Sequence, residues 1–495
     1  MLGAGAAAVT LRPGPVDDWL GRAGWPAGAQ PGTGTTAATP PEPPPDPVLA
    51  PADGSGPAPT PDGVRAALDP LVRAAGLGGR FGVTVVDVAT GQTLYARGPD
   101  TLTVPASTTK VVTAAAVLAT RGPAYRIPTR AVAGARPGEV VLVGGGDPTL
   151  AAGRVGAYPG AARLDALAAQ VKKSLGGTAP ARVTVDASLY SGPALGPAWD
   201  ADIATGGYAA PITALMTDGG QVDPRQQPPA ERFGDPDLAA GRAFAAALGL
   251  TGAAVRGVAR GAAPAPPTAA AESPAGPDPT PDVSGAAPSD GPDRSGPAGG
   301  PPPGTELGRV ESPPMLRLAE IMLAESDNVL AEALARQVAL ARGEPASYGG
   351  AAAAVDAVLA ELGLPADESA LADGSGLSRA SRLTPSLLTD LLALAASGRE
   401  PRLAGLFSGL PVAGWSGTLA GRFQAASGTG RAGVGAVRAK TGTLQGVNAM
   451  AGVAVTAQGR VLAFALLADG VRIGHWDAQA GLDAIAARLA RCGCR

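Results

Sequence analysis

Two segments of this chain are too rich in proline to fold, and they determine how the rest can be divided. Residues 27–62 and 261–304 combine proline with glycine, alanine, serine and threonine, as in PEPPPDP at 41–47. Such segments bury too little apolar surface to offset the entropy lost on folding. We therefore expect a disordered linker within residues 1–62 and a disordered insertion at 261–304, with folded segments on either side of the insertion.

The folded segments have the pattern of an α+β domain that carries an insertion. Apolar periodicity predicts helices at 64–76, 313–325, 329–342 and 476–490. Alternating apolar residues predict strands at 82–88, 92–97, 447–456 and 460–468. Strands near both ends of the chain predict one sheet built from residues 63–130 and 305–490, with 131–260 as an inserted region.

Histidine and cysteine are so scarce that several enzyme classes become improbable. The only histidine is His475, and the only cysteines are Cys492 and Cys494. These residues leave almost no basis for a zinc site, and neither a G-x-S-x-G elbow nor a phosphate-binding P-loop occurs. We expect no metal and no cofactor, and a hydrolase with this composition needs a base other than histidine. The formal charge of −3 offers no basic surface for nucleic acid.

The two ends of the chain leave alternatives open. Residues 2–11 are small and apolar, lack the basic residues of a signal peptide and are too few to span a bilayer. They are either part of an export or anchor segment, which would attach the chain to a membrane, or an unstructured alanine-rich start. Cys492 and Cys494 are compatible with free thiols, a small strained bridge or pairing between molecules.

The first candidate for catalysis is a serine followed three residues later by a lysine. Ser107 and Lys110 stand at the start of a predicted helix, where positions i and i+3 share one face. A buried lysine with a lowered pKa accepts the serine proton, and the helix N-terminus favours negative charge. Only four lysines occur in the chain, and only Lys110 follows a serine at this spacing. The alternative is a capping serine beside an exposed lysine.

A second candidate is the sequence Ser326-Asp327-Asn328, at the break between two predicted helices. These residue types also cap helices, which is the alternative interpretation. In the functional interpretation, the Ser326 hydroxyl and the Asn328 amide face a cleft. The serine would then pass a proton to a leaving amine, and the asparagine would hold Lys110 and a substrate carbonyl.

A third candidate, Lys440-Thr441-Gly442-Thr443, precedes the predicted hairpin. A glycine within a strand allows the backbone of a ligand to come close, and the lysine and hydroxyl groups beside it suit a carboxylate. The alternative is an ordinary edge strand with a surface lysine. Lysine is rare in this chain, however, and arginine supplies most of its positive charge.

Ser-x-x-Lys, Ser-x-Asn and Lys-Thr-Gly in this order are the signature of penicillin-recognising serine enzymes. The chain resembles the class C low-molecular-mass penicillin-binding proteins, the D-Ala-D-Ala carboxypeptidase and endopeptidase family also called peptidase S13. The similar segments are VPASTTK at 104–110, VGGGDPTL at 143–150, AAPITAL at 209–215, ESDNVLAE at 325–332, DGSGLSR at 373–379 and KTGTLQGVNAMAG at 440–452.

The resemblance implies a penicillin-binding or β-lactamase-like transpeptidase fold, with an antiparallel sheet flanked by helices and a helical subdomain. Ser107 and Ser326 lie 219 residues apart (326 − 107), more than in compact β-lactamases, and mostly-β domains inserted at 131–260 would account for the distance. The implied substrates are peptidoglycan stem peptides outside the cytoplasm, cut by a carboxypeptidase activity. The resemblance leaves open whether an endopeptidase activity accompanies it. β-Lactams are expected to acylate the enzyme.

The resemblance also implies roles for individual residues. Ser107 is the expected nucleophile and Lys110 its base, while Ser326 and Asn328 assist the proton transfer and orient the substrate. The backbone N–H groups of Ser107 and Thr443 are expected to form the oxyanion hole. The terminal carboxylate is expected to meet the motif formed by Lys440, Thr441, Gly442 and Thr443.

Three further positions are candidates for substrate contact. Asp147 corresponds to a family aspartate that meets the free amine of the stem peptide, although an Asp-Pro turn is the simpler explanation. Arg379 corresponds to an arginine that lines the cleft, with a surface arginine as its alternative. Gln445 follows the Lys-Thr-Gly strand and is expected to border the same cleft.

Three other functions compete with this prediction. A β-lactamase shares the fold but needs a base for fast deacylation, for which the sequence shows no counterpart. A non-catalytic wall-binding protein is disfavoured because all three motifs are intact. An esterase on the same fold is the third alternative, which assays of D-Ala release and ester cleavage would separate.

Overall fold

The computed structural model describes residues 56–267, 300–423 and 430–495. The linker expected at 1–62 lies almost entirely outside the described residues. So does most of the insertion expected at 261–304.

The central sheet joins the two ends of the chain, as the alternating strands predict. Its order is β10–β11–β12–β1–β2, and each neighbouring pair is antiparallel. The strands are β1 (Arg80–Asp87), β2 (Thr93–Arg97), β10 (Val437–Leu444), β11 (Val447–Val455) and β12 (Val461–Asp469). The first strand therefore pairs directly with the last one along the chain, which confirms the expected α+β sheet.

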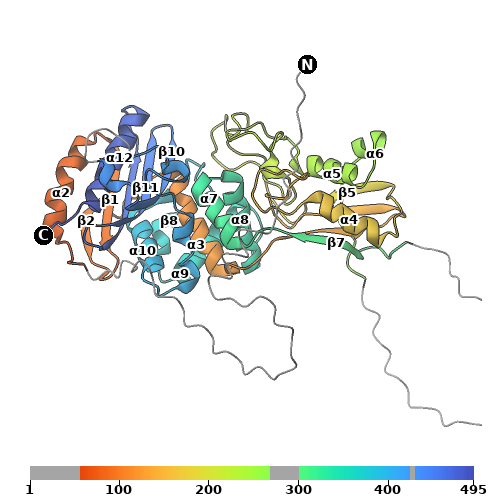
Figure 1. The fold of residues 1–495 in the computed structure, drawn as a ribbon, viewed down its shortest axis with the longest axis horizontal. Coiled ribbons are helices and arrows are strands. Elements are labelled where there is room, and N and C mark those ends of the chain that lie inside the picture. The colour runs from red at the N-terminus through yellow and green to blue at the C-terminus, as the bar shows by residue number, and fades with distance from the viewer. Residues whose placement is uncertain (1–55, 268–299, 424–429) are drawn as a thin grey trace, which may run out of the picture. The chain divides into compact units, whose positions relative to one another are not determined.

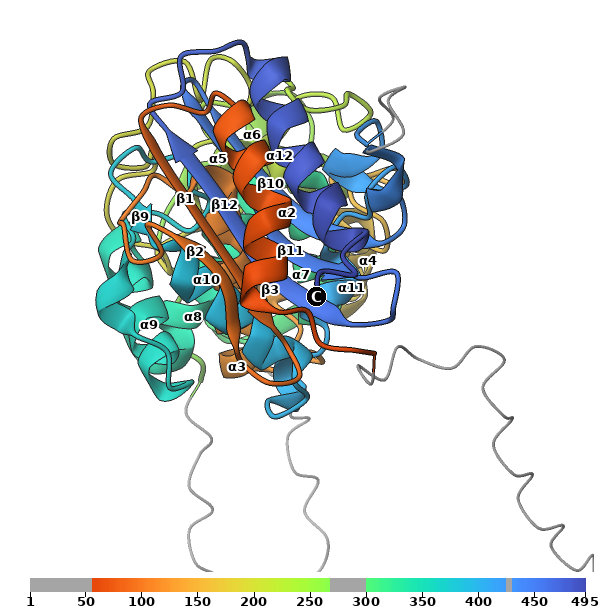
Figure 2. The same ribbon diagram turned by 90° about the vertical axis from the view of Figure 1, so that its left-hand side faces the viewer.

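Two helices from opposite ends of the chain cover one face of this sheet (Figure 2). They are α2 (Pro61–Ala74) and α12 (His475–Ala490). The hydroxyl of Thr60 caps α2 by accepting a hydrogen bond from the N–H of Gly63 at 3.1 Å, and Pro61 supplies a preset φ angle. Val64 and Leu68 of α2 are fully buried against the sheet.

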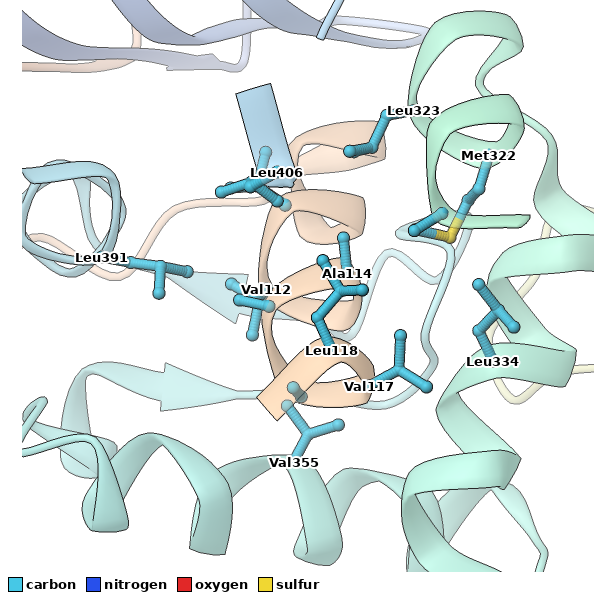
Figure 3. Packing of buried hydrophobic residues seen from close by; sticks show 14 of the residues in the cluster. Val112, Ala114, Val117, Leu118, Met322, Leu323, Leu334, Val355, Leu391 and Leu406 are labelled. Carbon is cyan, nitrogen blue, oxygen red and sulfur yellow. The ribbon is translucent and has the colours of Figure 1, made fainter. Parts of the chain in front are cut away.

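The other face of the sheet carries a helical layer built around α3 (Thr109–Arg121). Every residue of α3 from Thr109 to Ala119 is buried, as an alanine- and valine-rich helix without a polar face requires. Figure 3 shows Val112, Val117 and Leu118 among side chains from the surrounding helices. Each such large apolar side chain contributes about 1.5–3 kcal/mol when fully buried.

The remaining elements of the helical layer frame α3. Its helices are α7 (Met315–Glu325), α8 (Asn328–Arg342), α9 (Tyr348–Glu361), α10 (Pro385–Ala396) and α11 (Leu406–Gly409). A small hairpin is formed by β8 (Ser369–Ala370) and β9 (Arg382–Leu383). Helices α7 and α8 meet at a break of two residues, which confirms the polar interruption expected between them.

The inserted region forms a second five-stranded sheet of order β6–β5–β4–β3–β7 (Figure 1). Its strands are β3 (Pro128–Ala133), β4 (Glu139–Val143), β5 (Arg182–Asp186), β6 (Ala259–Arg260) and β7 (Glu306–Glu311). Its helices are α4 (Leu164–Ser174), α5 (Pro236–Ala247) and α6 (Gly252–Arg256).

This insert contains more helix than the mostly-β region that we expected. Strands β4 and β5 are parallel, as are β5 and β6, and parallel neighbours need long crossover connections, which are usually helical. Strand β7 pairs with β3 of the same sheet, although its residues were expected to belong to the catalytic part.

The C-terminal cysteines are joined in the structure. Cys492 and Cys494 form a disulfide, and both residues are buried against the layer of α2 and α12. The carbonyl of Cys494 accepts a hydrogen bond from the N–H of Thr60 at 2.8 Å, which ties the last residues to the start of α2. Within the described ranges, no helix is both long enough and apolar enough to cross a membrane.

A buried ion pair joins β1 to the turn before β12. Arg460 Nε lies 2.6 Å from Asp87 Oδ2, and only 1% of the Asp87 side chain is exposed. Asp87 also accepts hydrogen bonds from the N–H groups of Ala89 and Thr90. Burial alone would raise the pKa of Asp87, but the guanidinium and these N–H groups lower it overall.

Replacing Asp87 by alanine leaves the Arg460 guanidinium buried without its carboxylate. We expect Asp87→Ala to lower the free energy of unfolding by about 3–5 kcal/mol, measured by urea denaturation. The control is Asp62→Ala, which removes an exposed ion pair with Arg65 and should leave the urea midpoint unchanged. A loss no larger than that of the control would contradict the prediction.

Candidate active site

Ser107 stands in a short 3-10 turn (Ala106–Thr108) that leads directly into α3. The turn begins at Ala106, whose φ of 47° lies in the left-handed region that side chains other than glycine rarely adopt. The Thr108 hydroxyl donates to the carbonyl of Pro105 at 2.7 Å and holds the turn closed. Ser107 thereby reaches the surface of a cavity at the end of the buried helix.

Lys110 lies one turn further along and is completely buried. Its Nζ lies 2.9 Å from Ser107 Oγ, 2.7 Å from Asn328 Oδ1 and 2.7 Å from the carbonyl oxygen of Ser375. Burial lowers the pKa of the Lys110 amine to about 8, although nearby carboxylates act in the opposite direction. The sequence-based pairing of Ser107 with Lys110 is therefore present as a direct contact.

Two of the three Lys110 partners can only accept hydrogen bonds. The Ser375 partner is a backbone carbonyl, and Asn328 presents its oxygen because its Nδ2 donates to the carbonyl of Tyr208 at 2.9 Å. A neutral lysine amine has two N–H bonds and one lone pair. The two acceptors take the N–H bonds, so the lone pair points at Ser107 Oγ.

The break between α7 and α8 presents the second motif to the same cavity. Ser326 ends α7 with a left-handed φ of 58°, and Asp327 caps α8 by accepting the N–H of Leu330 at 2.9 Å. The hydroxyl of Tyr158, from the insert, donates to the other Asp327 oxygen at 2.7 Å. Helix capping and exposure to the cavity therefore occur together, since Ser326, Asp327 and Asn328 all line it.

The third motif lies on β10, the edge strand beside the turn that carries Ser107. Gly442 allows this approach, because a Cβ there would lie 2.8 Å from the carbonyl oxygen of Pro105 and 3.0 Å from the nitrogen of Ser107. Thr441 and Thr443 line the cavity, and the Thr441 hydroxyl lies 2.8 Å from that of Thr418.

Lys440 was expected to face the substrate, but its position in the structure is different. It is fully buried, does not line the cavity and donates from Nζ to the carbonyl of Thr441 at 2.7 Å. Burial lowers the pKa of its amine far below the usual range, and the charge on Lys110 lowers it further. Because alternate residues of a strand share a face, Lys440 lies on the same face of β10 as Gly442, the residue that approaches Ser107.

The cavity around these motifs has a volume of about 1210 Å³. Two predicted residues meet at its edge, where the Arg379 guanidinium donates to both oxygens of Asp200 at 2.8–3.0 Å and to the carbonyl of Gln445 at 3.1 Å. The ion pair with Arg379 lowers the pKa of Asp200. Within the described parts of the chain, no group of three or more His, Cys, Asp or Glu residues is arranged to hold a metal ion.

Asp147 does not reach this cavity. It is 2% exposed, and one of its oxygens accepts hydrogen bonds from the N–H and hydroxyl of Thr149 at 2.8 and 2.6 Å. Burial raises the pKa of its carboxyl to about 6. The geometry is that of an Asp-Pro turn, the explanation that the sequence left open, and the predicted contact with the stem peptide has no support here.

Several residues of the site were not predicted from the sequence. Tyr208, Thr418 and Asp200 line the cavity, and Asp200 is the partner of Arg379. Their partners are 23 to 179 positions away in sequence, so no local pattern signals them. Only Glu332 carried a signal, since it stands one helical turn after Asn328 in ESDNVLAE.

The model of the D-Ala-D-Ala carboxypeptidase 3 (S13) family matches residues 64–264 and 296–492. This chain belongs to that family. A protein named carboxypeptidase DacB from Mycolicibacterium smegmatis is 39% identical over 464 residues, which are 92% of this chain and 91% of that protein. A D-alanyl-D-alanine carboxypeptidase of an Actinomadura species is 30% identical over 473 residues, covering 83% of this chain and 81% of the relative.

The fold is shared with a solved member of the class. Penicillin binding protein 4 from Haemophilus influenzae superposes with a TM-score of 0.64 at 22% identity, over 85% of this chain and 98% of that one. The same protein in complex with a β-lactam gives a TM-score of 0.59. The penicillin-binding fold and the serine peptidase class predicted from the motifs are thus confirmed.

The close approach of β10 to Ser107 can be tested at Gly442. A Cβ in Gly442→Ala would press on backbone atoms, so β10 or the Ser107 turn must shift. We expect the rate constant for acylation by a fluorescent penicillin to fall by about 10- to 100-fold. In the control, Gly349→Ala, the new Cβ enters open space in α9 and should leave the rate unchanged. Equal rates for both variants would exclude this role for Gly442.

Proposed function

We propose that this chain is a serine-type D-Ala-D-Ala carboxypeptidase of peptidoglycan in which Ser107 is the nucleophile and Lys110 its general base. The observation that supports this most strongly is the environment of the Lys110 amine. Its two fixed acceptors direct the lone pair at Ser107 Oγ, and Ser107 opens onto a cavity of about 1210 Å³. The family match supports the same activity.

Acylation then follows from the positions of these groups. Ser107 Oγ attacks the carbonyl carbon of the penultimate D-Ala, and its proton passes to Lys110 Nζ. The N–H groups of Ser107 and Thr443 stabilise the oxyanion, because both residues line the cavity on neighbouring segments. Ser326 relays a proton to the departing D-Ala amine, and water later hydrolyses the ester on Ser107.

The substrate carboxylate is proposed to bind at the hydroxyl groups of β10. Thr441 and Thr443 line the cavity, and the buried amine of Lys440 donates to the Thr441 carbonyl. Further along the cleft, Arg379 and Gln445 are proposed to meet the rest of the stem peptide, together with Asp200. β-Lactams should occupy the same positions and leave a stable acyl group on Ser107.

Since peptidoglycan lies outside the cytoplasm, we propose that the chain acts in the cell envelope, exported or anchored through its N-terminal segment. Residues 1–55 lie outside the described residues, so the support is the substrate of the family. DD-endopeptidase activity is part of the same proposal, because it cleaves the same type of bond in cross-linked peptides. A cross-linked muropeptide dimer tests it by the release of monomers.

The activity is tested by following D-Ala release from a stem pentapeptide that ends in D-Ala-D-Ala. Wild-type protein should release one D-Ala per peptide, and Ser107→Ala should reduce the rate by at least about 10³-fold. The control is Ser408→Ala, which removes an exposed hydroxyl from α11 and should keep the wild-type rate. Wild-type protein that cleaves simple esters but not the peptide would favour an esterase instead.

The acylation rate should depend on pH through Lys110. The neutral amine is the base, and burial lowers its pKa to about 8. Protonation below that pKa removes the base, so the rate constant for penicillin acylation should rise with pH, reach half its maximum near pH 8 and level off at higher pH. Stopped-flow labelling between pH 6 and pH 10 measures this profile. A rate that is constant over the whole range would contradict Lys110 as the base.

A further inference from the structure

Two side chains of α8, one helical turn apart, hold the two acceptors of the Lys110 amine. Asn328 supplies its own side-chain oxygen at 2.7 Å. Glu332 acts at a distance, because its Oε1 accepts the N–H groups of Gly374 and Ser375 at 3.1 and 2.8 Å. The carbonyl of the same Ser375 accepts the second hydrogen bond from Lys110 at 2.7 Å.

Two further contacts restrict the segment that carries Ser375. The carbonyl of Gly374 accepts the hydroxyl of Thr113, on α3, at 2.7 Å. Gly376 has a φ of +78°, and a Cβ there would lie 1.9 Å from the carbonyl oxygen of Ala106. Residues 374–376 therefore lie directly against the turn that carries Ser107, and a shift of one would displace the other.

Charged groups surround this contact on several elements. Glu332 is fully buried and pairs with Arg336 at 3.3 Å, whose guanidinium lies over the ring of Tyr348 at 4.1 Å and that of Tyr190 at 5.4 Å. Asp373, next to Gly374, is also buried and accepts the indole N–H of Trp199 at 2.9 Å.

These carboxylates also act on the Lys110 amine. Asp373, Glu332 and Asp327 all raise the pKa of Lys110, against the larger effect of burial. Lys440 is the other buried amine near Lys110.

We infer that Glu332 is a positioning residue for the acylation reaction, which fixes the Ser375 carbonyl and so directs the lone pair of Lys110 at Ser107. This inference rests on the proposed function. It assigns to Glu332 two separable effects: its carboxylate geometry holds residues 374 and 375, and its negative charge stabilises the protonated form of Lys110 formed during attack.

Glu332→Gln tests both effects, with the rate constant for acylation by a fluorescent penicillin followed from pH 6 to pH 10. The amide loses the charge and is a weaker acceptor for two N–H groups. We expect the maximal rate constant to fall about tenfold or more, and the acid limb of the pH profile to move to lower pH. The rate constant reports on folded molecules only, while the amplitude of labelling reports on their number.

Glu332→Asp separates charge from position. The charge stays, but the shorter side chain does not span to both N–H groups, so the maximal rate should fall while the acid limb stays in place. The control is Glu361→Gln, which removes an exposed partner of Arg342 at the far end of α8 and should reproduce the wild-type profile. A wild-type rate constant and acid limb in Glu332→Gln would overturn the inference.

Two further results keep the test decisive. If Glu332→Gln labels poorly because Arg336 is left as a buried cation, the double variant Glu332→Gln/Arg336→Gln removes that charge. Slow acylation in the double variant supports the inference, and wild-type kinetics in it overturn the inference. If the wild-type protein is not labelled at all, the proposed function fails, and the inference about Glu332 fails with it.

Discussion

A lysine amine without solvent contact needs an acceptor for each of its N–H bonds, and Lys110 obtains its acceptors from distant parts of the chain. Asn328 comes from α8 and the Ser375 carbonyl from a segment beyond α9. Burial of an unpaired ammonium would cost several kcal/mol, so these contacts must form together with the core around α3. The interaction that makes Ser107 reactive is therefore also a constraint on the folding of the helical layer.

The inserted region contributes contacts that hold several residues of the site in place. Its Tyr208 carbonyl fixes the orientation of the Asn328 amide, and its Tyr158 hydroxyl binds Asp327. Asp200 neutralises Arg379 at the edge of the cavity. The insert thus supplies contacts to the residues that flank the second motif and to the arginine of the cleft. Its own sheet and helices form a separate core, which holds these contacts in place.

The sequence predicted the parts of the fold that depend on local pattern. Alternating strands at both chain ends predicted the central sheet, and the spacing of Ser107 and Lys110 at the start of a helix predicted their pairing. Sequence patterns did not predict the positions that depend on tertiary contacts. Lys440 was expected to face the substrate but is buried and does not line the cavity, and the insert contains more helix than expected because its parallel strands need crossovers. Asp147 lies in the Asp-Pro turn that was the simpler explanation from the sequence. The position of Glu332 one helical turn after Asn328 is visible in the sequence, but its contact with residues 374 and 375 depends on tertiary structure.

The most direct test of this account is the site of acylation. The purified protein is incubated with benzylpenicillin, its intact mass is measured, and the modified peptide is identified by fragmentation. We predict one penicilloyl adduct per chain, on Ser107, because this hydroxyl alone among the cavity serines contacts the Lys110 amine. An adduct on Ser326, or a folded protein that gains no mass, would contradict Ser107 as the nucleophile and Lys110 as its base.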